Sequence, residues 1–262
     1  MKTTHKFFPT RLSIYLSTAL LYLFSTQPAF TQNPPAKDYT KVPIGIEYIT
    51  ITMDQENWQL TCVCHNYRVA RDYVPIIDTV KGSIHTLDSR VVPHYNKMYD
   101  AALADNVTLV ALIGYRSMEW QENYFNNKVQ RHQDQDGMTE EQALLYTIRG
   151  SAYPGASEHN LGLCMDFTPA LVSFADTEQF AWLMANGADY GFILRYPSDK
   201  RAITGYNYEP WHWRYVGVEV AKALKENGIC FDEYLGQRYL SPEDAQKLRE
   251  QGISVEEYLR KQ

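Results

Sequence analysis

Two short segments of this chain carry residue types that can hold and use a divalent metal. They are SEHNLGLCMD at positions 157–166 and EPWHWR at positions 209–214. A catalytic zinc takes about three protein ligands of the His, Asp, Glu or Cys type, keeps one position open for water, and needs a nearby carboxylate to accept that water's proton. The two segments therefore predict a zinc (Zn2+) site with His159, Asp166 and His212 as ligands and Glu209 as the catalytic base.

The sequence around the first segment indicates how two of these ligands could reach one metal. A polar loop at 150–158 precedes His159, whereas residues 161–167 are mostly apolar and typical of a short strand. A bend between loop and strand would bring His159 and Asp166 to one ion. Gly162 is expected to let the backbone pass close to that ion, because glycine has no side chain to obstruct it.

The second segment is predicted to be extended. Pro210 lies between Glu209 and His212, and proline disfavours a helix interior. The arrangement therefore differs from metalloproteases that place two histidines on one face of a helix.

The pattern Ser-x-His-x-x-Gly-x-x-x-Asp followed by Glu-x-x-His resembles the signature of the VanY-type D-alanyl-D-alanine carboxypeptidases, zinc peptidases that trim peptidoglycan stem peptides. A third segment, GYRSMEWQ at 114–121, resembles that family's substrate-binding segment, and the similarity runs from about Asn57 to about Leu235. The resemblance implies removal of the C-terminal D-alanine from a stem peptide, with Arg116, Ser157 and Gln121 as substrate-binding residues.

Two other side chains of the second segment have two interpretations each. Trp211 either lines the substrate site or belongs to the hydrophobic core. Arg214 either supports Asp166 or forms an ion pair at the surface.

The cysteines raise separate questions. Cys164, with Met165 after it, departs from the family pattern of small or aliphatic residues, and we expect it to change strand packing and not the ligand set. Cys62 and Cys64 would lie on the same face of one strand, which is a poor geometry for a mutual disulfide. The pairing of these three and Cys230 stays open.

The predicted zinc site is compatible with more than one kind of peptidoglycan hydrolase. An L,D-carboxypeptidase or a peptidoglycan endopeptidase would use the same ligands, because the shape of the pocket decides the substrate. A non-catalytic cell-wall-binding module on the same scaffold is the alternative of another class, although the intact Glu209 speaks against it. The expected partner is the stem-peptide substrate, with no stable protein partner implied.

The net charge and the N-terminal segment indicate which partners and which cellular location to expect. The net charge of −6 and the isoelectric point near 5.7 argue against electrostatic binding to nucleic acid or anionic lipid. Basic residues precede an apolar stretch at 12–26, which predicts a signal peptide at 1–31 or an N-terminal anchor. We expect an exported protein, extracellular, in the cell wall or periplasmic, with a linker at 32–45 and a catalytic domain at 46–262 that ends in a helical extension from about 236.

Apolar periodicity and turn residues predict an α+β fold with an antiparallel or mixed sheet and flanking helices. Strands are expected at 46–53, 58–64, 107–113, 161–167, 192–196 and 211–216, and helices at 93–104, 119–131, 140–148, 180–190 and 218–227, with further helices after 240. Thr139 and Gln142 form a capping-box pattern. The family resemblance implies the fold shared with Hedgehog amino-terminal domains.

Overall fold

A four-stranded antiparallel sheet with the order β5-β6-β8-β7 forms the centre of the fold in the computed structural model, which describes residues 46–262. Its strands are β5 (Ala111–Ile113), β6 (Cys164–Phe167), β8 (His212–Tyr215) and β7 (Phe192–Leu194). Two small sheets pair β1 (Ile49–Ile51) with β2 (Tyr67–Val69) in parallel, and β3 (Ile77–Thr79) with β4 (Thr86–Asp88) in antiparallel fashion. The signal segment and the linker expected at 1–31 and 32–45 lie outside the described residues.

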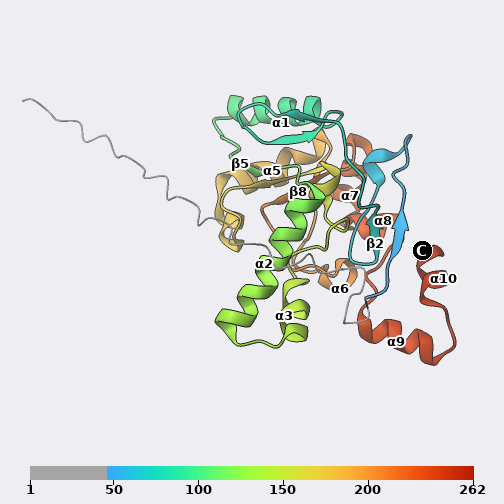
Figure 1. The fold of residues 1–262 in the computed structure, drawn as a ribbon. Coiled ribbons are helices and arrows are strands. Elements are labelled where there is room, and N and C mark those ends of the chain that lie inside the picture. Colours follow the sequence, from blue (N-terminus) through green and yellow to red (C-terminus); the bar gives the residue numbers. More distant parts are fainter. Residues whose placement is uncertain (1–45) are drawn as a thin grey trace, which may run out of the picture. The chain divides into compact units, whose positions relative to one another are not determined.

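Within the described residues, the α-helices come after the first four strands along the chain, and the last four helices follow the last strand (Figure 1). They are α1 (Val92–Ala104), α2 (Met118–Asp136), α3 (Glu140–Thr147), α4 (Glu158–Leu161), α5 (Glu178–Asn186), α6 (Arg201–Thr204), α7 (Val218–Asn227), α8 (Phe231–Leu235), α9 (Pro242–Glu250) and α10 (Val255–Arg260). The predicted α+β class is confirmed. Within residues 46–262, no helix has both the length and the apolar character that crossing a membrane requires.

Helix boundaries follow the local signals of the sequence. The predicted capping box is present at α3, where the Thr139 hydroxyl accepts from the backbone N–H of Gln142 and the Gln142 side chain accepts from that of Thr139. Ser117 caps α2 in the same way as Ser241 caps α9, each through its hydroxyl oxygen. Gly228 ends α7 in the left-handed conformation that glycine adopts without strain.

The alternation of side chains along β6 and β8 gives the central sheet two different faces. One face contributes to the main hydrophobic core through Met165, Phe167, Trp213 and Tyr215. The other face carries Cys164, Asp166, His212 and Arg214. All residues of both strands are buried, so the polar face is covered as well.

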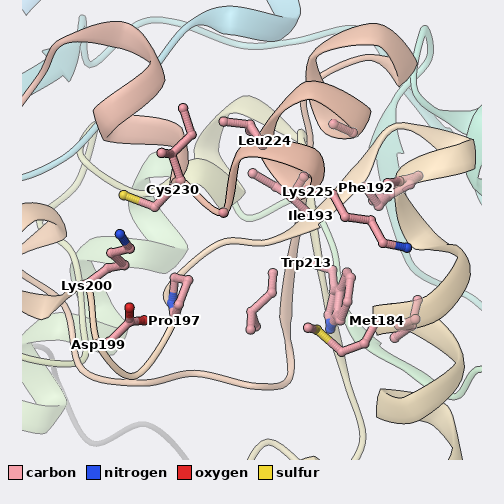
Figure 2. A pocket seen from close by; sticks show the side chains of 16 residues that line it. Met184, Phe192, Ile193, Pro197, Asp199, Lys200, Trp213, Leu224, Lys225 and Cys230 are labelled. Atoms are coloured by element: carbon pink, nitrogen blue, oxygen red, sulfur yellow. The ribbon is translucent and has the colours of Figure 1, made fainter.

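A cavity of about 270 Å³ borders the apolar face, between α5, β7 and α7 (Figure 2). Phe192, Trp213 and Leu224 are among its apolar lining residues. Trp213 and His212 are neighbours on β8 and therefore point to opposite faces. Ile193, which pairs with Arg214, lines the cavity as well, so the cavity lies at the β7 edge of the sheet.

The prediction of a strand at 58–64 is wrong. Residues Trp58–Leu60 form one turn of 3₁₀ helix, and Cys64 makes only an isolated bridge to Tyr67. The backbone carbonyls of Gln59 and Thr61 instead accept hydrogen bonds from the Arg214 guanidinium at 2.9 and 2.7 Å. A long-range contact therefore overrides the strand-like composition of this segment.

The last helices pack on the N-terminal strands. Asn66 donates to the Leu240 carbonyl and accepts from the Leu240 N–H, at 3.3 and 2.9 Å. The Tyr67 hydroxyl donates to the carbonyl of Leu259 at 3.0 Å, and α10 lies beside β1 (Figure 1). These bonds fix the chain after α8 against the first sheet.

Candidate active site

The sheet register brings two of the predicted ligands together. Asp166 of β6 lies directly opposite His212 of β8. Side chains at opposed positions of an antiparallel pair approach closely, and His212 Nδ1 lies 2.8 Å from Asp166 Oδ1. The extended conformation predicted around His212 is thereby confirmed.

The third predicted ligand comes from α4, a single turn placed directly before β6. The sequence predicted a loop here, but His159 lies in the first turn of this helix, and the Ser157 hydroxyl caps it by accepting from the His159 N–H at 3.3 Å. The helix sets the direction of the imidazole, whose Nε2 lies 3.2 Å from Asp166 Oδ2. The structure therefore brings all three predicted ligands to one place.

Gly162 packs tightly against a neighbouring strand. It ends α4 with φ of +69°, and a Cβ at this position would lie 2.7 Å from the backbone nitrogen of Asp88. The backbone of Gly162 thus passes close to β4, and its approach to a metal stays a prediction. Glycine is required here because the backbone is both left-handed and tightly packed.

The hydrogen bonds of the two imidazoles leave one nitrogen of each ring directed at Asp166. His159 Nδ1 lies 2.6 Å from the Gly114 carbonyl oxygen, which can only accept, so this nitrogen carries the proton. His212 Nε2 lies 3.2 Å from Glu158 Oε2 and donates to that carboxylate. Metal-binding histidines are usually held in this way by a carbonyl or carboxylate.

The ionisation of Asp166 completes a donor set that fits a divalent cation. Burial raises the pKa of this carboxyl, but His159 and His212 lower it more, and the result lies well below the ordinary range. Two imidazole nitrogens and one carboxylate are a usual ligand set for catalytic zinc. The three residues are at most 5% exposed, and a cation bound among them would take the place of the contacts that the two imidazoles make with the carboxylate.

A buried network of four charges lies behind His212. Glu158 Oε1 accepts from Arg195 Nε at 2.7 Å and from Arg214 Nη1 at 2.8 Å, and Asp232 pairs with Arg195. All four are at most 2% exposed, and their charges balance, as buried ions require. Burial raises the pKa of Glu158, but Arg195 and Arg214 lower it further, so that the carboxylate stays charged beside His212.

Both interpretations of Arg214 were wrong, and the role of Glu158 was missed. Arg214 is fully buried and binds Glu158, not Asp166. No local signal marks Glu158 as the partner of an imidazole. Its two arginine partners lie 37 and 56 positions away, and only the fold brings them together.

Glu209 lies next to the ligand cluster. Its backbone carbonyl accepts from the N–H of His212 at 3.1 Å. Burial raises the pKa of its carboxyl to about 7, against the opposing charges of His212 and His159. A partly buried carboxyl with a raised pKa beside a metal site has the properties of a general base.

Arg116 borders the cluster from the segment after β5. Its Nη2 donates to Asp166 Oδ2 at 3.3 Å and its Nη1 to Gln121 Oε1 at 3.4 Å. Within residues 46–262, its Nε has no hydrogen-bond partner. The guanidinium lies 4.7 Å from the centre of the Trp120 ring, which limits its movement.

The remaining predicted substrate residues have structural contacts. Gln121 is buried and donates to the Ala152 carbonyl at 2.8 Å, and Ser157 caps α4. Trp211 is partly buried and packs against the main core, which agrees with the second of its two interpretations. Their part in substrate binding stays a prediction.

Cys164 lies beside the predicted ligands. Its Sγ and one imidazole nitrogen each of His159 and His212 are within 4.8 Å of one another. Its side chain shares the face of β6 that carries Asp166. The expectation that it leaves the ligand set unchanged stays a prediction. The four cysteines are free and buried, so none of them forms a disulfide.

Comparison with known proteins identifies relatives of this arrangement. The family model for VanY, described as D-alanyl-D-alanine carboxypeptidase, matches residues 84–218, which contain every predicted site residue. The D-alanyl-D-alanine carboxypeptidase of Enterococcus faecalis (strain ATCC 700802 / V583) is 36% identical over 182 residues, or 70% of this chain and 67% of the relative.

Solved structures share the fold. A mutant of the vancomycin-resistance D,D-pentapeptidase VanY in complex with Zn(II) is 36% identical, with a TM-score of 0.60 over 68% of this chain and 99% of that chain. The LD-carboxypeptidase LdcB is 30% identical, with a TM-score of 0.62 over 73% of this chain and 91% of that chain. The chain belongs to the VanY family of D-alanyl-D-alanine carboxypeptidases.

Proposed function

We propose that this chain is a zinc-dependent carboxypeptidase that removes the C-terminal D-alanine from peptidoglycan stem peptides. The observation that carries the proposal is the convergence of His159 Nε2 and His212 Nδ1 on the Asp166 carboxylate. The other nitrogen of each ring is bonded to a protein acceptor. His159 Nε2 and His212 Nδ1 are therefore the nitrogens that can bind a metal. The Zn(II) in the VanY structure supports zinc as the metal.

Zinc and Glu209 have separate roles in the proposed hydrolysis. Zinc in this site would polarise the scissile carbonyl and favour ionisation of the attacking water. The Glu209 carboxylate takes a proton from that water and returns it to the nitrogen of the departing alanine. A pKa raised by burial to about 7 suits a group that must accept and return a proton near neutral pH.

Arg116 is proposed to bind the free carboxylate of the stem peptide. A guanidinium presents its N–H groups as a planar fork that matches a carboxylate. Gln121 and Trp120 hold it beside Asp166, so a carboxylate bound there would lie next to the scissile bond. This contact would select the end of a peptide over an internal bond.

A tetrapeptide stem is the second candidate substrate, because the LD-carboxypeptidase LdcB matches this chain as well as VanY does by TM-score. Cleavage of cross-links by an endopeptidase and binding of the cell wall without catalysis are two further candidate functions. Peptidoglycan lies outside the cytoplasmic membrane, so the proposed substrate supports an exported protein. This agrees with the export signal proposed at 1–31.

One set of digests separates these four functions. Pentapeptide stems, tetrapeptide stems, amidated pentapeptides and cross-linked dimers are incubated with the protein, and the products are weighed by mass spectrometry. We expect loss of one alanine from free pentapeptides, which a chelator stops and zinc restores. Loss of alanine from tetrapeptides alone would identify an L,D-carboxypeptidase, and cleavage of cross-linked dimers would identify an endopeptidase. If the zinc-loaded protein released no product, it would be a binding module.

A further inference from the structure

Lys128 of α2 places a positive charge close to the proposed catalytic base. Its ammonium donates to the Ser151 hydroxyl at 2.7 Å, and that hydroxyl donates to the carbonyl of Gly150 at 2.6 Å. A Cβ on Gly150 would lie 3.8 Å from Glu209 Oε1, so this glycine lies directly beside the carboxylate of the base. Two loop residues thus connect Lys128 to the group that is proposed to activate water.

No carboxylate of the described chain balances this charge. Within residues 46–262, the Lys128 ammonium bonds a hydroxyl and forms no ion pair. Its neighbours at the spacings that pair side chains on a helix are Tyr124, Phe125, Arg131 and His132, none of them acidic. Lys128 is partly exposed, so its ammonium can bind an anionic group of a ligand.

Arg116 and Lys128 flank one aromatic ring. The centre of the Tyr124 ring lies 5.2 Å from Arg116 Cζ and 5.1 Å from Lys128 Nζ. The two cations are therefore at most about 10 Å apart, the span of about three residues of extended peptide. Trp120 stacks on Tyr124 at 5.0 Å between ring centres and is 41% exposed. The two rings give a peptide an aromatic surface to lie on beside both charges.

We propose that Lys128 determines specificity by binding a carboxylate that the substrate carries two or three residues before its C-terminal D-alanine. The proposal rests on the proposed function, because it takes Arg116 to bind the free C-terminus. With the terminus held there, a carboxylate on the second or third residue of a pentapeptide comes within reach of the Lys128 ammonium. The flexible lysine side chain suits a group whose position varies more than that of the terminus.

Four synthetic pentapeptides test this proposal. All end in D-alanyl-D-alanine, and they form two pairs whose members differ only in a free carboxylate or its amide. One pair carries this group at the second residue and the other pair at the third. The release of alanine gives kcat/KM for the zinc-loaded full chain, for Lys128→Met and for Lys97→Met. Lys97 is the matched control, because it is an exposed lysine of α1, whose buried residues belong mainly to the main core.

Wild type and Lys97→Met should prefer the carboxylate in at least one pair by about 3- to 10-fold in kcat/KM, the range between an exposed and a buried charged contact. Lys128→Met should lose this preference. The ratio within a pair distinguishes binding from structural damage, because damage would slow both members alike. The preference of wild type should also shrink as salt is raised, since salt screens a partly exposed pair.

The remaining outcomes separate this subsite from the proposed function. Equal rates within both pairs for wild type, a preference that persists in Lys128→Met, or a wild-type preference that salt does not change would overturn the role of Lys128. The carboxypeptidase activity would stand in each of these cases. Release of alanine from none of the peptides by zinc-loaded wild type would overturn the proposed function itself, and this subsite with it.

Discussion

The Glu158 carboxylate and the His212 imidazole form a buried pair in which Oε2 and Nε2 are 3.2 Å apart. The contact directs the opposite nitrogen of His212 at Asp166. Arg195 and Arg214 in turn hold Glu158 through its second oxygen. The orientation of one predicted metal ligand thus depends on buried charges next to it on the same face of the sheet.

Replacement of Glu158 should therefore weaken metal binding. We expect Glu158→Gln to lower zinc affinity by about 10- to 100-fold, the usual effect of losing the partner of a metal-bound histidine. Asp232→Asn is the control, because Asp232 pairs with the same Arg195 but does not contact His212. Both variants should unfold at lower denaturant concentration. Competition with a chromophoric chelator measures the affinities, and equal losses in the two variants would reduce Glu158 to a stabilising residue.

Glu209→Gln separates metal binding from chemistry. The amide keeps the shape of the side chain but cannot accept the proton of the attacking water. We expect one zinc per chain and a loss of turnover of at least about 100-fold, the scale of general-base catalysis. Glu233→Gln, whose carboxylate pairs with Lys200 away from the ligands, should keep turnover. Full activity in Glu209→Gln would show that another group is the base.

Arg116→Lys tests the recognition of the free carboxylate. Lysine keeps the positive charge, but its ammonium cannot form the paired hydrogen bonds of a guanidinium. We expect at least about a 10-fold loss of kcat/KM on pentapeptide stems, with zinc content unchanged. Amidated stems, which lack the carboxylate, should be poor substrates for wild type and variant alike. If wild type cleaves amidated and free stems equally, Arg116 does not bind the terminus.

His65 makes stability depend on pH. This residue is 1% exposed, and its Nε2 donates to the Ile148 carbonyl at 2.9 Å. Burial, with the charge of Arg68, lowers its pKa from 6.5 to about 3. Below about pH 6.5 the unfolded chain takes up a proton that the folded chain does not, so stability falls as pH falls, by about 1.4 kcal/mol per pH unit until about pH 3.

The corresponding measurement uses denaturant unfolding at about pH 6.5 and about pH 5. His65→Gln can still donate to the Ile148 carbonyl but does not titrate. It should show a smaller drop in the free energy of unfolding between the two pH values than wild type, by about 2 kcal/mol. Equal drops would mean that His65 is not neutral in the folded protein.

Local patterns predicted the elements that carry the ligands. The apolar run before Asp166 and the proline before His212 correctly indicated short extended segments, observed as β6 and β8. The capping residues around α3 likewise located that helix. Such features depend on neighbouring residues, so one sequence is enough to find them.

What could not be predicted depends on contacts between distant segments. The turn at Trp58–Leu60 forms where a strand was expected, beside carbonyls that bind Arg214 more than 150 positions away. The link from Glu158 to His212 and the nearness of Cys164 to both histidines depend on the register of β6 with β8 and on the packing of α4 against β6. Register is set by the whole fold, because shifting a strand by one residue would turn each side chain to the other face.

Anomalous scattering at the zinc absorption edge, measured on crystals of the zinc-loaded protein, tests the ligand assignment most directly. We expect one zinc peak per chain, about 2.0–2.2 Å from His159 Nε2, His212 Nδ1 and an Asp166 carboxylate oxygen. His212→Ala should lose this peak. A zinc peak bound by other residues, or no peak in the zinc-loaded protein, would contradict the assignment of the active site.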